Sequence, residues 1–311
     1  MKPLPQTTTI DASEARERIA ARLVGRETEL ELILAAVAAG RNLVLEGPPG
    51  TSKTTILKAI TEEWGIPLFL AEGNADLSAA KLVGHHSPAR VLRDDYSADT
   101  FVPGPLAQAM TEGGFLYIEE LNRAPEETLN TLLMAIADRQ LVVPRFGTVT
   151  AAPTFRLVAS MNPLDDVGTR RLSTSVHDRL CRLSIDYQDE QTERAIVRLR
   201  SGEAAGGALG ERLTADAVAA TRATREHLDL RQGSSVRGAI DLQLVSRELA
   251  TLRRIESPED ERYGALLLDA MLLALSGRIQ LDEVVERTPE DVLREIWEQL
   301  VAATPRSTAP G

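Results

Sequence analysis

The octapeptide Gly47-Pro48-Pro49-Gly50-Thr51-Ser52-Lys53-Thr54 decides the fold. An apolar run at 42–45 leads into it, and a helical pattern at 54–64 leads out of it. Strand, glycine-rich turn and helix in this order are the context of a phosphate-binding loop. Glycines let the backbone turn tightly, so that N–H groups of the loop and of the helix start point at a phosphate. The stretch predicts a nucleotide site that consists of Gly47, Pro48, Pro49, Gly50, Thr51, Ser52, Lys53, Thr54 and Thr55.

Two side chains of this loop have separate tasks. Lys53 is placed to reach the outer phosphates, and Thr54 offers a hydroxyl to Mg²⁺. The strict pattern has a glycine where this chain has Ser52, but a small residue can still fit there. The alternative is a Gly/Pro turn that happens to precede a helix. The Lys-Thr pair and the flanking elements favour the phosphate loop.

A second apolar run, 115–118, ends in Glu119 and Glu120. A buried parallel strand would deliver these carboxylates to the edge of the sheet where ligands bind. We expect Glu119 beside Mg²⁺, directly or through water, and Glu120 as the group that polarises the attacking water. Asn162 follows another core strand, 154–160, and would hold the water or the γ-phosphate from the same edge. The alternatives are a strand that ends in solvated acids and a turn-forming Asn-Pro pair.

The order of strands and helices predicts two domains. Strands and helices alternate up to about residue 187, which indicates an α/β domain with a parallel sheet and an insertion at about 74–102. An α-helical lid is expected at 188–303, and a disordered tail at 304–311. Thr28 is the expected N-cap of an early helix, with Glu31 completing a capping box. Core positions of one lid helix are expected at Leu242, Leu244, Val245, Leu249 and Leu252.

Composition excludes several classes of protein. The net charge of the 311 residues is −11, which argues against nucleic-acid binding and against a DNA-acting motor. The single cysteine, Cys181, rules out an intrachain disulfide and reads as a small core residue. The adjacent histidines His85 and His86 have no third ligand at a suggestive spacing, so no metal site is expected there. Without a signal-like or membrane-spanning stretch, a cytoplasmic protein is expected.

Together these motifs resemble the AAA+ ATPases, and among them the MoxR family, over residues 23–300. The phosphate loop fits the family pattern G-x-P-G-x-[AS]-K-T, which accounts for Ser52. The other matching motifs are Phe101 to Pro105, Asn122-Arg123-Ala124-Pro125, Asn162-Pro163, Gly168-Thr169, Asp178-Arg179 and Ser235-Val236-Arg237. The resemblance implies the AAA+ fold, ATP with Mg²⁺ as ligands, ATPase activity, and a helical insertion near the pore of a ring.

Two arginines take roles from this resemblance. Arg179 is the chosen arginine finger that acts on a neighbouring subunit's nucleotide, with Arg170 and Arg171 as competing candidates. The alternative for Arg179 is a salt bridge with Asp178 or Asp186. Arg237 would reach the γ-phosphate from the lid, and its alternative is a solvated arginine at a helix start.

The resemblance also implies partners. The family forms ring homo-oligomers, here expected to be hexamers, and commonly works with a protein carrying a von Willebrand A domain. The sequence is most similar to members associated with maturation of a molybdenum–copper carbon monoxide dehydrogenase. One departure is Glu119, where the family has aspartate. The extra methylene keeps two functions open: an ATP-driven remodelling chaperone, and a slowly hydrolysing, ATP-dependent binding switch that recruits partner proteins.

Overall fold

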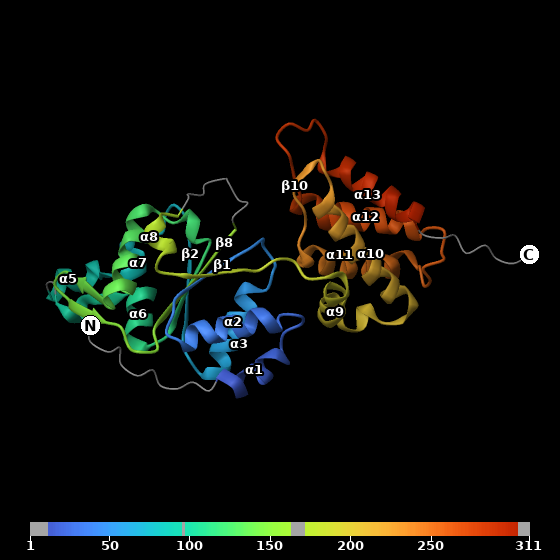
Figure 1. Ribbon diagram of the computed structural model, residues 1–311. Coiled ribbons are helices and arrows are strands. Elements are labelled where there is room, and N and C mark those ends of the chain that lie inside the picture. The colour runs from blue at the N-terminus through green and yellow to red at the C-terminus, as the bar shows by residue number, and fades with distance from the viewer. Residues whose placement is uncertain (1–11, 95–96, 163–171, 304–311) are drawn as a thin grey trace, which may run out of the picture. The chain divides into compact units, whose positions relative to one another are not determined.

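A computed structural model of the protein describes residues 12–94, 97–162 and 172–303. Contacts divide the chain into two units, Met1–Asp186 and Tyr187–Gly311, each with a hydrophobic core (Figure 1). The predicted parallel α/β fold with a helical C-terminal part is confirmed. None of the described helices has the length and apolar character needed to cross a membrane. The expected tail, 304–311, lies outside the described residues.

A five-stranded parallel sheet in the order β2-β5-β8-β1-β9 forms the centre of the first unit. The strands are short and apolar, as expected for a sheet covered on both faces. The strand bounds are β1 (Leu43–Glu46), β2 (Leu68–Glu72), β5 (Phe115–Glu119), β8 (Arg156–Met161) and β9 (Cys181–Ser184). The helices connecting or flanking them are α1 (Ala12–Ala20), α2 (Glu27–Ala38), α3 (Lys53–Trp64), α6 (Pro105–Glu112), α7 (Glu126–Asp138) and α8 (Thr174–His177).

Alternate strand residues pack into two separate cores. Val44, Leu116 and Ile118 join the core built with α6 and α7. Leu45 and Tyr117 join the core built with α1, α2 and α3. Because successive side chains of a strand point to opposite faces, this division places the helices on both sides of the sheet, as Figure 1 shows. In parallel sheets covered in this way, ligands bind at the carboxyl ends of the strands.

The segment between β2 and α6 carries small elements of its own. They are α4 (Ala79–Val83), β3 (Gly84–His86), α5 (Pro88–Asp94), the 3₁₀ turn η1 (Ala98–Thr100) and β4 (Phe101–Pro103). Strands β3 and β4 pair antiparallel. A second antiparallel pair joins β6 (Gln140–Val143) to β7 (Gly147–Thr150).

The predicted start of α2 is wrong by two residues. The helix begins at Glu27 with Arg26 at the N-cap, so that Thr28 lies within its first turn. The Arg26 side chain is buried and donates to the Asp186 carbonyl (2.6 Å) and to Glu29 (2.5 Å). These long-range and local bonds fix the chain before Thr28 can act as a cap.

The second unit is helical apart from one small strand pair. Its helices are α9 (Glu190–Ser201), α10 (Gly207–Glu226), α11 (Val236–Arg253), α12 (Tyr263–Leu275) and α13 (Pro289–Ala303), with 3₁₀ turns η3 (Gly202–Ala205) and η4 (Ser276–Arg278). Antiparallel strands β10 (Leu230–Gln232) and β11 (Gln280–Leu281) were not predicted, because two or three residues show no periodicity.

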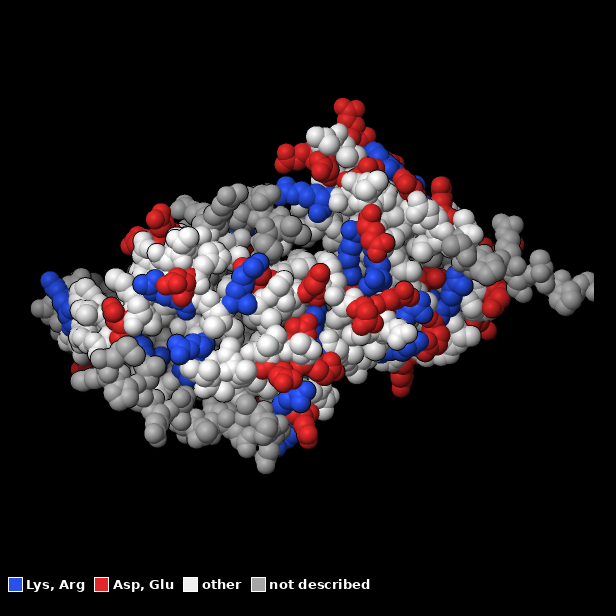
Figure 2. Space-filling view, in the orientation of Figure 1, with Lys and Arg blue, Asp and Glu red and all other residues white. Residues whose placement is uncertain are grey.

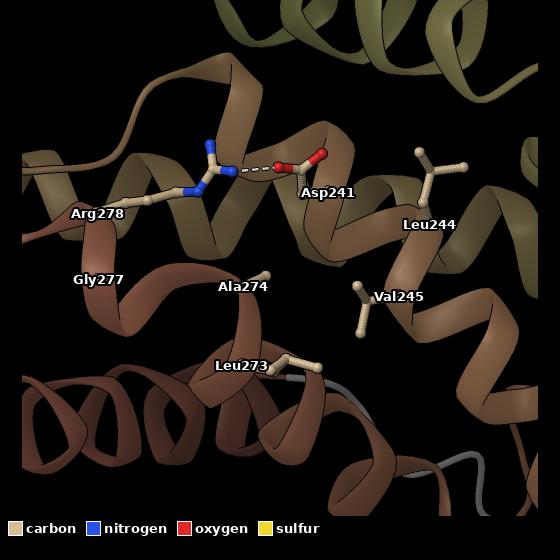
Figure 3. Close-up of a pocket in the computed structure, with 7 residues that line it drawn as sticks. All are labelled: Asp241, Leu244, Val245, Leu273, Ala274, Gly277 and Arg278. Carbon is tan, nitrogen blue, oxygen red and sulfur yellow. Dashed lines mark hydrogen bonds and ion pairs between the residues drawn. The ribbon is translucent and has the colours of Figure 1, made fainter.

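Two of the five core positions predicted on α11 are wrong. Leu242 is buried, and Val245 and Leu249 pack partly against the core. Leu244 is 36% exposed and Leu252 is 78% exposed, because they lie on another face of the helix. Leu244 lines a pocket of about 380 Å³ with Asp241, Val245, Leu273, Ala274, Gly277 and Arg278, where Asp241 and Arg278 form an ion pair (Figure 3).

Candidate active site

Residues 47–52 form a tight turn between β1 and α3, as the sequence predicts. Gly47 has φ 156° and Gly50 has φ 78°, in the region that favours glycine. A Cβ on Gly47 would lie 1.9 Å from the Ile185 carbonyl oxygen, so no larger residue fits. Pro48 is half-buried, Pro49 is exposed, and Thr51 is buried with its hydroxyl bonded to the Pro48 carbonyl (2.9 Å).

Ser52 adopts the backbone conformation of the glycine it replaces. Its φ of 69° and ψ of 13° are left-handed, which costs an L-residue about 1–2 kcal/mol. The loop thus keeps its turn geometry despite the substitution, and α3 begins at the next residue. The first N–H groups of a helix have no intrahelical acceptor and point toward an anion that binds there.

The Lys53 ammonium lies over the turn. Its Nζ donates to the carbonyls of Gly47 (2.9 Å) and Pro48 (2.8 Å) and to the Thr51 hydroxyl (3.1 Å). All three acceptors are neutral. Phosphate oxygens form stronger, charge-assisted bonds, so an incoming phosphate can attract this ammonium away from them.

A hydroxyl and a carboxylate meet at the first turn of α3. Thr54 Oγ1 donates to Glu119 Oε1 at 2.5 Å, although 65 residues separate them in sequence. The Tyr117 hydroxyl lies 3.3 Å from Thr54 Oγ1 and donates to Ser160 Oγ at 3.0 Å. Burial raises the pKa of Tyr117, so the phenol stays protonated and can donate. The Thr54 hydroxyl and the Glu119 carboxylate are oxygen groups of the kind that Mg²⁺ prefers as ligands.

Glu120 turns away from the strand in a strained conformation. Its φ of 53° is left-handed, and such strain collects at functional sites. The side chain is 45% exposed and pairs with Arg123 Nε at 3.0 Å. Gly73 fixes this bend, because its N–H donates to the Glu119 carbonyl (2.7 Å) and an added Cβ would lie 2.1 Å from the Glu120 carbonyl oxygen.

Asn162 follows β8, which lies between β1 and β5 in the sheet. Three neighbouring strands therefore bring the predicted groups to the same end of the sheet. The phosphate loop follows β1, Asn162 follows β8, and the two acids lie at the end of β5. The Asn122 amide donates to the Asn162 carbonyl at 3.4 Å. Thr55, also predicted for the site, is exposed on α3.

Arg179 lies at the amino end of β9, whereas the phosphate loop follows the carboxyl end of the parallel strand β1. It precedes β9, whose parallel register pairs Cys181 with Leu43 and Ser184 with Glu46. The four residues of β9, about 13 Å of strand, separate it from the edge with the phosphate loop. The side chain is exposed, with Nη1 donating to the Ser175 carbonyl at 3.0 Å. Arg170 and Arg171 lie outside the described residues.

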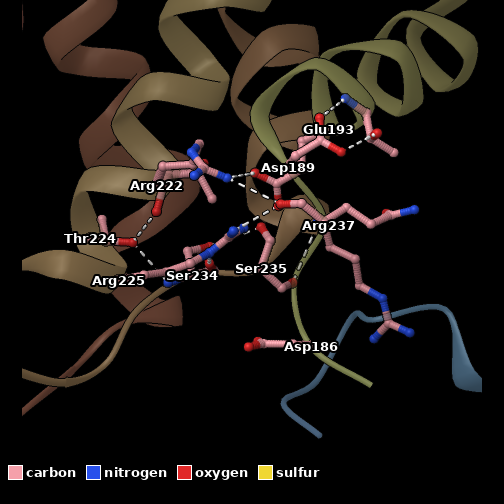
Figure 4. Close-up of polar contacts among 12 residues, drawn as sticks. Asp186, Asp189, Glu193, Arg222, Thr224, Arg225, Ser234, Ser235 and Arg237 are labelled. Atoms are coloured by element: carbon pink, nitrogen blue, oxygen red, sulfur yellow. Dashed lines mark hydrogen bonds and ion pairs between the residues drawn. The ribbon is translucent and has the colours of Figure 1, made fainter. Parts of the chain in front are cut away.

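The predicted helix-start motif occurs in the second unit. Ser235 is the N-cap of α11, and its side chain accepts a bond from Arg237 N at 3.3 Å. The Arg237 side chain is exposed, as a residue available to a ligand must be. Figure 4 shows it extending away from the helix start.

The cysteine prediction is wrong. Cys181 is exposed, because β9 is the edge strand of the sheet, where an apolar run need not be covered. No group of three potential metal-binding side chains occurs among the described residues. His86 instead contacts the Thr100 hydroxyl (3.0 Å) and the Pro144 carbonyl (3.2 Å), which links the two hairpins, while His85 is exposed.

Several residues that support the site were not predicted. Besides Gly73, Tyr117 and Ser160, the buried Glu46 directly precedes the loop and pairs with Arg182 at 2.5 Å. Hydrogen bonding to Glu46 raises the pKa of Arg182. Period-2 spacing from Glu119 would have placed Tyr117 on the same strand face. The other contacts join distant segments and leave no local signal.

Comparisons with known proteins agree with this geometry. Residues 42–180 match the family described as "AAA domain (dynein-related subfamily)". Residues 11–71 match the "MoxR domain in the MoxR-vWA-beta-propeller ternary systems". An uncharacterized protein of Staphylococcus epidermidis is 30% identical over 178 residues, 56% of this chain. The match spans 66% of that relative, which is less than two thirds of its length.

Two solved structures share the fold. A mutant of RuvB from Thermotoga maritima matches with a TM-score of 0.52 and 19% identity, over 81% of this chain and 71% of RuvB. NtrX from Brucella abortus in complex with ADP matches with a TM-score of 0.51 and 19% identity, over 76% of this chain and 53% of NtrX.

Proposed function

We propose that this chain is a MoxR-type AAA+ protein that binds ATP with Mg²⁺ at the carboxyl ends of its strands and hydrolyses it. The observation that carries the proposal is the 2.5 Å contact between Thr54 and Glu119, beside the Lys53 ammonium and the start of α3. A hydroxyl, a carboxylate, an ammonium and the N–H groups of a helix start together suit a metal-bound triphosphate.

Each residue then has a task in hydrolysis. Loop N–H groups, the start of α3 and Lys53 bind the phosphates, and Thr54 and Glu119 would hold Mg²⁺. Bound there, the ion neutralises charge on the phosphoryl group. Glu120, half-exposed and next to Glu119 in the chain, accepts a hydrogen bond from the attacking water and orients it. Asn162 offers its amide from the neighbouring strand end.

The position of Arg179 supports a ring. Arg179 lies at the amino end of β9, and the phosphate loop of its own chain lies at the carboxyl ends of the strands. We therefore assign Arg179 to a neighbouring subunit's nucleotide. Hydrolysis then depends on assembly, and a closed ring, proposed to be a hexamer, satisfies every site equally. Arg237 would contact the γ-phosphate from the helical unit.

The partners are proposed from the family matches. A von Willebrand A protein and a β-propeller protein are the candidates, since the matching family takes its description from systems containing both. A remodelling chaperone that matures a metalloenzyme, such as a molybdenum–copper carbon monoxide dehydrogenase, is the function that the resemblance favours. Nucleic acid is not proposed as a partner, because Figure 2 shows acidic and basic side chains interspersed over the visible face and the net charge is −11.

The rival function is a binding switch that holds ATP with negligible turnover. Glu119 favours it, because its carboxylate already reaches Thr54 where the family has the shorter aspartate. Steady-state phosphate release separates the two functions. Glu119→Asp should preserve or raise turnover if the chain is a true ATPase.

The test of the nucleotide site is Lys53→Ala, with Lys58→Ala as its control. Lys58 lies on the same helix and is exposed, so its removal changes net charge equally without touching the loop. We expect Lys53→Ala to abolish binding of a fluorescent ATP analogue and Lys58→Ala to leave it unchanged. Equal affinity of the two variants would refute the assignment of the phosphate loop.

A further inference from the structure

An ion cluster around the buried Glu193 in the second unit has no part in the chemistry described above. Glu193 on α9 is 2% exposed and bonds Arg225 Nη1 (2.7 Å) and Arg222 Nη1 (3.3 Å) on α10. Nη2 of Arg225 is buried without a hydrogen-bond partner among the described residues. A buried carboxylate is costly unless it is paired. Glu193 is paired with Arg225, which is 11% exposed, and with Arg222, which is 31% exposed.

The cluster holds the segment where the chain enters the second unit. Arg222 Nη1 also donates to the Gln188 carbonyl at 3.2 Å. The Arg225 guanidinium lies 3.8 Å from the centre of the Tyr187 ring, a cation–π contact. Tyr187 and Gln188 are the first two residues of the unit. Their positions are therefore tied to the charge of Glu193.

The same cluster holds the start of α11. Arg225 Nε donates to the Ser234 carbonyl at 2.7 Å, and Ser234 N donates to the Thr224 hydroxyl at 2.9 Å (Figure 4). The contact is close, since a Cβ on Gly233 would lie 2.6 Å from Arg225 Cα. The next residue, Ser235, caps α11. Arg237 thus extends from a backbone whose position Arg225 sets.

We propose that Glu193 and Arg225 are positioning residues for Arg237, and that they join Arg237 to the chain entry at Tyr187 as one rigid group. This inference rests on the proposed contact between Arg237 and the γ-phosphate. Within the helical unit, the chain of contacts from Glu193 through Arg225 to Ser234 sets where the Arg237 side chain begins.

A double-mutant cycle tests the inference. The variants are Glu193→Gln, Arg237→Ala and the pair, and the readout is the ratio of the Kd for ADP to the Kd for ATP. Arg237→Ala should lower this preference for ATP about tenfold, the size expected for a lost charge-assisted hydrogen bond. Glu193→Gln should lower it about fivefold, and the pair should lose no more than about tenfold, because both act on one contact.

Glu211→Gln is the matched control. Glu211 on α10 pairs with Arg198 on α9, so it joins the same two helices, but both side chains are about half exposed. Its loss should leave the ATP preference unchanged. If Glu193→Gln fails to fold, as thermal unfolding would show, Arg225→Lys replaces it. That variant keeps the charge, but one ammonium group cannot replace the guanidinium that bonds both Ser234 and Glu193. It should lower the preference for ATP, and combining it with Arg237→Ala should cause little further loss.

The outcomes separate the inference from the proposed function. If the losses multiply to about fiftyfold, Glu193 acts independently of Arg237 and the inference is wrong, while ATP binding stands. If Arg237→Ala leaves the preference unchanged, the cluster has nothing to position and the inference is again wrong. The proposed ATP binding is tested separately, and it fails if the wild-type protein binds ATP no better than Lys53→Ala does.

Discussion

Replacing Ser52 by glycine should stabilise the first unit, although it removes a side chain. Ser52 holds φ 69° in the phosphate loop, a conformation that costs an L-residue about 1–2 kcal/mol. Glycine avoids this cost. Among the described contacts, the Ser52 hydroxyl caps no N–H group of α3, so no hydrogen bond of that kind is lost.

The expected gain follows from two opposing terms. Relief of the left-handed conformation contributes about 1–2 kcal/mol. The greater freedom of glycine in the unfolded chain costs about 0.5–1 kcal/mol. The net stabilisation is about 0.5–1 kcal/mol, which corresponds to a rise in Tm of about 2 °C for a unit of this size.

Ser52→Ala separates conformation from side-chain chemistry. Alanine bears the same left-handed cost as serine, so its Tm should match that of the wild type within about 1 °C. The assay is thermal unfolding of the three proteins without nucleotide, monitored by calorimetry. A rise in Tm for Ser52→Ala equal to that for Ser52→Gly would refute the reasoning, because conformation could not then be the cause.

The remaining predictions concern the acids, the tyrosine and the ring. Gly73→Ala should lower steady-state phosphate release at least about tenfold. The new Cβ would lie 2.1 Å from the Glu120 carbonyl oxygen, so the backbone at Glu120 would have to move. Unchanged turnover would show that the bend at Glu120 is not needed. Tyr117→Phe should weaken ATP binding about fivefold in the presence of Mg²⁺ and leave it unchanged without Mg²⁺, since the lost hydroxyl contacts Thr54; equal effects in nucleotide titrations with and without Mg²⁺ would contradict this. Arg179→Ala should bind ATP without hydrolysing it, and mixing it with Lys53→Ala should restore phosphate release in mixed rings; if subunits exchange and no mixture exceeds the sum of its parts, the assignment in trans fails, and Arg170 and Arg171 are tested the same way.

The central elements could be predicted because each is encoded locally. The glycines, Lys53 and Thr54 adjoin one another, and Glu119 and Glu120 directly follow an apolar run. Parallel strands bring their carboxyl ends together, so the spatial meeting of Thr54 with Glu119 follows from the fold class alone. The structure adds the hydrogen bond that joins them.

What the sequence could not show depends on contacts between distant segments. Gly73 follows β2 and contacts Glu120 at the end of the neighbouring strand β5. Nothing near residue 73 in the sequence indicates this contact. Cys181 looked like a core residue because its exposure depends on β9 being an edge strand, which is a property of the strand order. Thr28 failed as an N-cap because Arg26 bonds a carbonyl 160 residues away.

The most direct test of ATP hydrolysis at this edge of the sheet is a comparison of wild type with Glu120→Gln. ATP retention and phosphate release are measured on the same protein samples. We predict that Glu120→Gln retains ATP with wild-type affinity but releases phosphate at least about a hundredfold more slowly, because the water loses its polarising carboxylate. Normal phosphate release by Glu120→Gln would contradict the assignment, since another group would then have to activate the water.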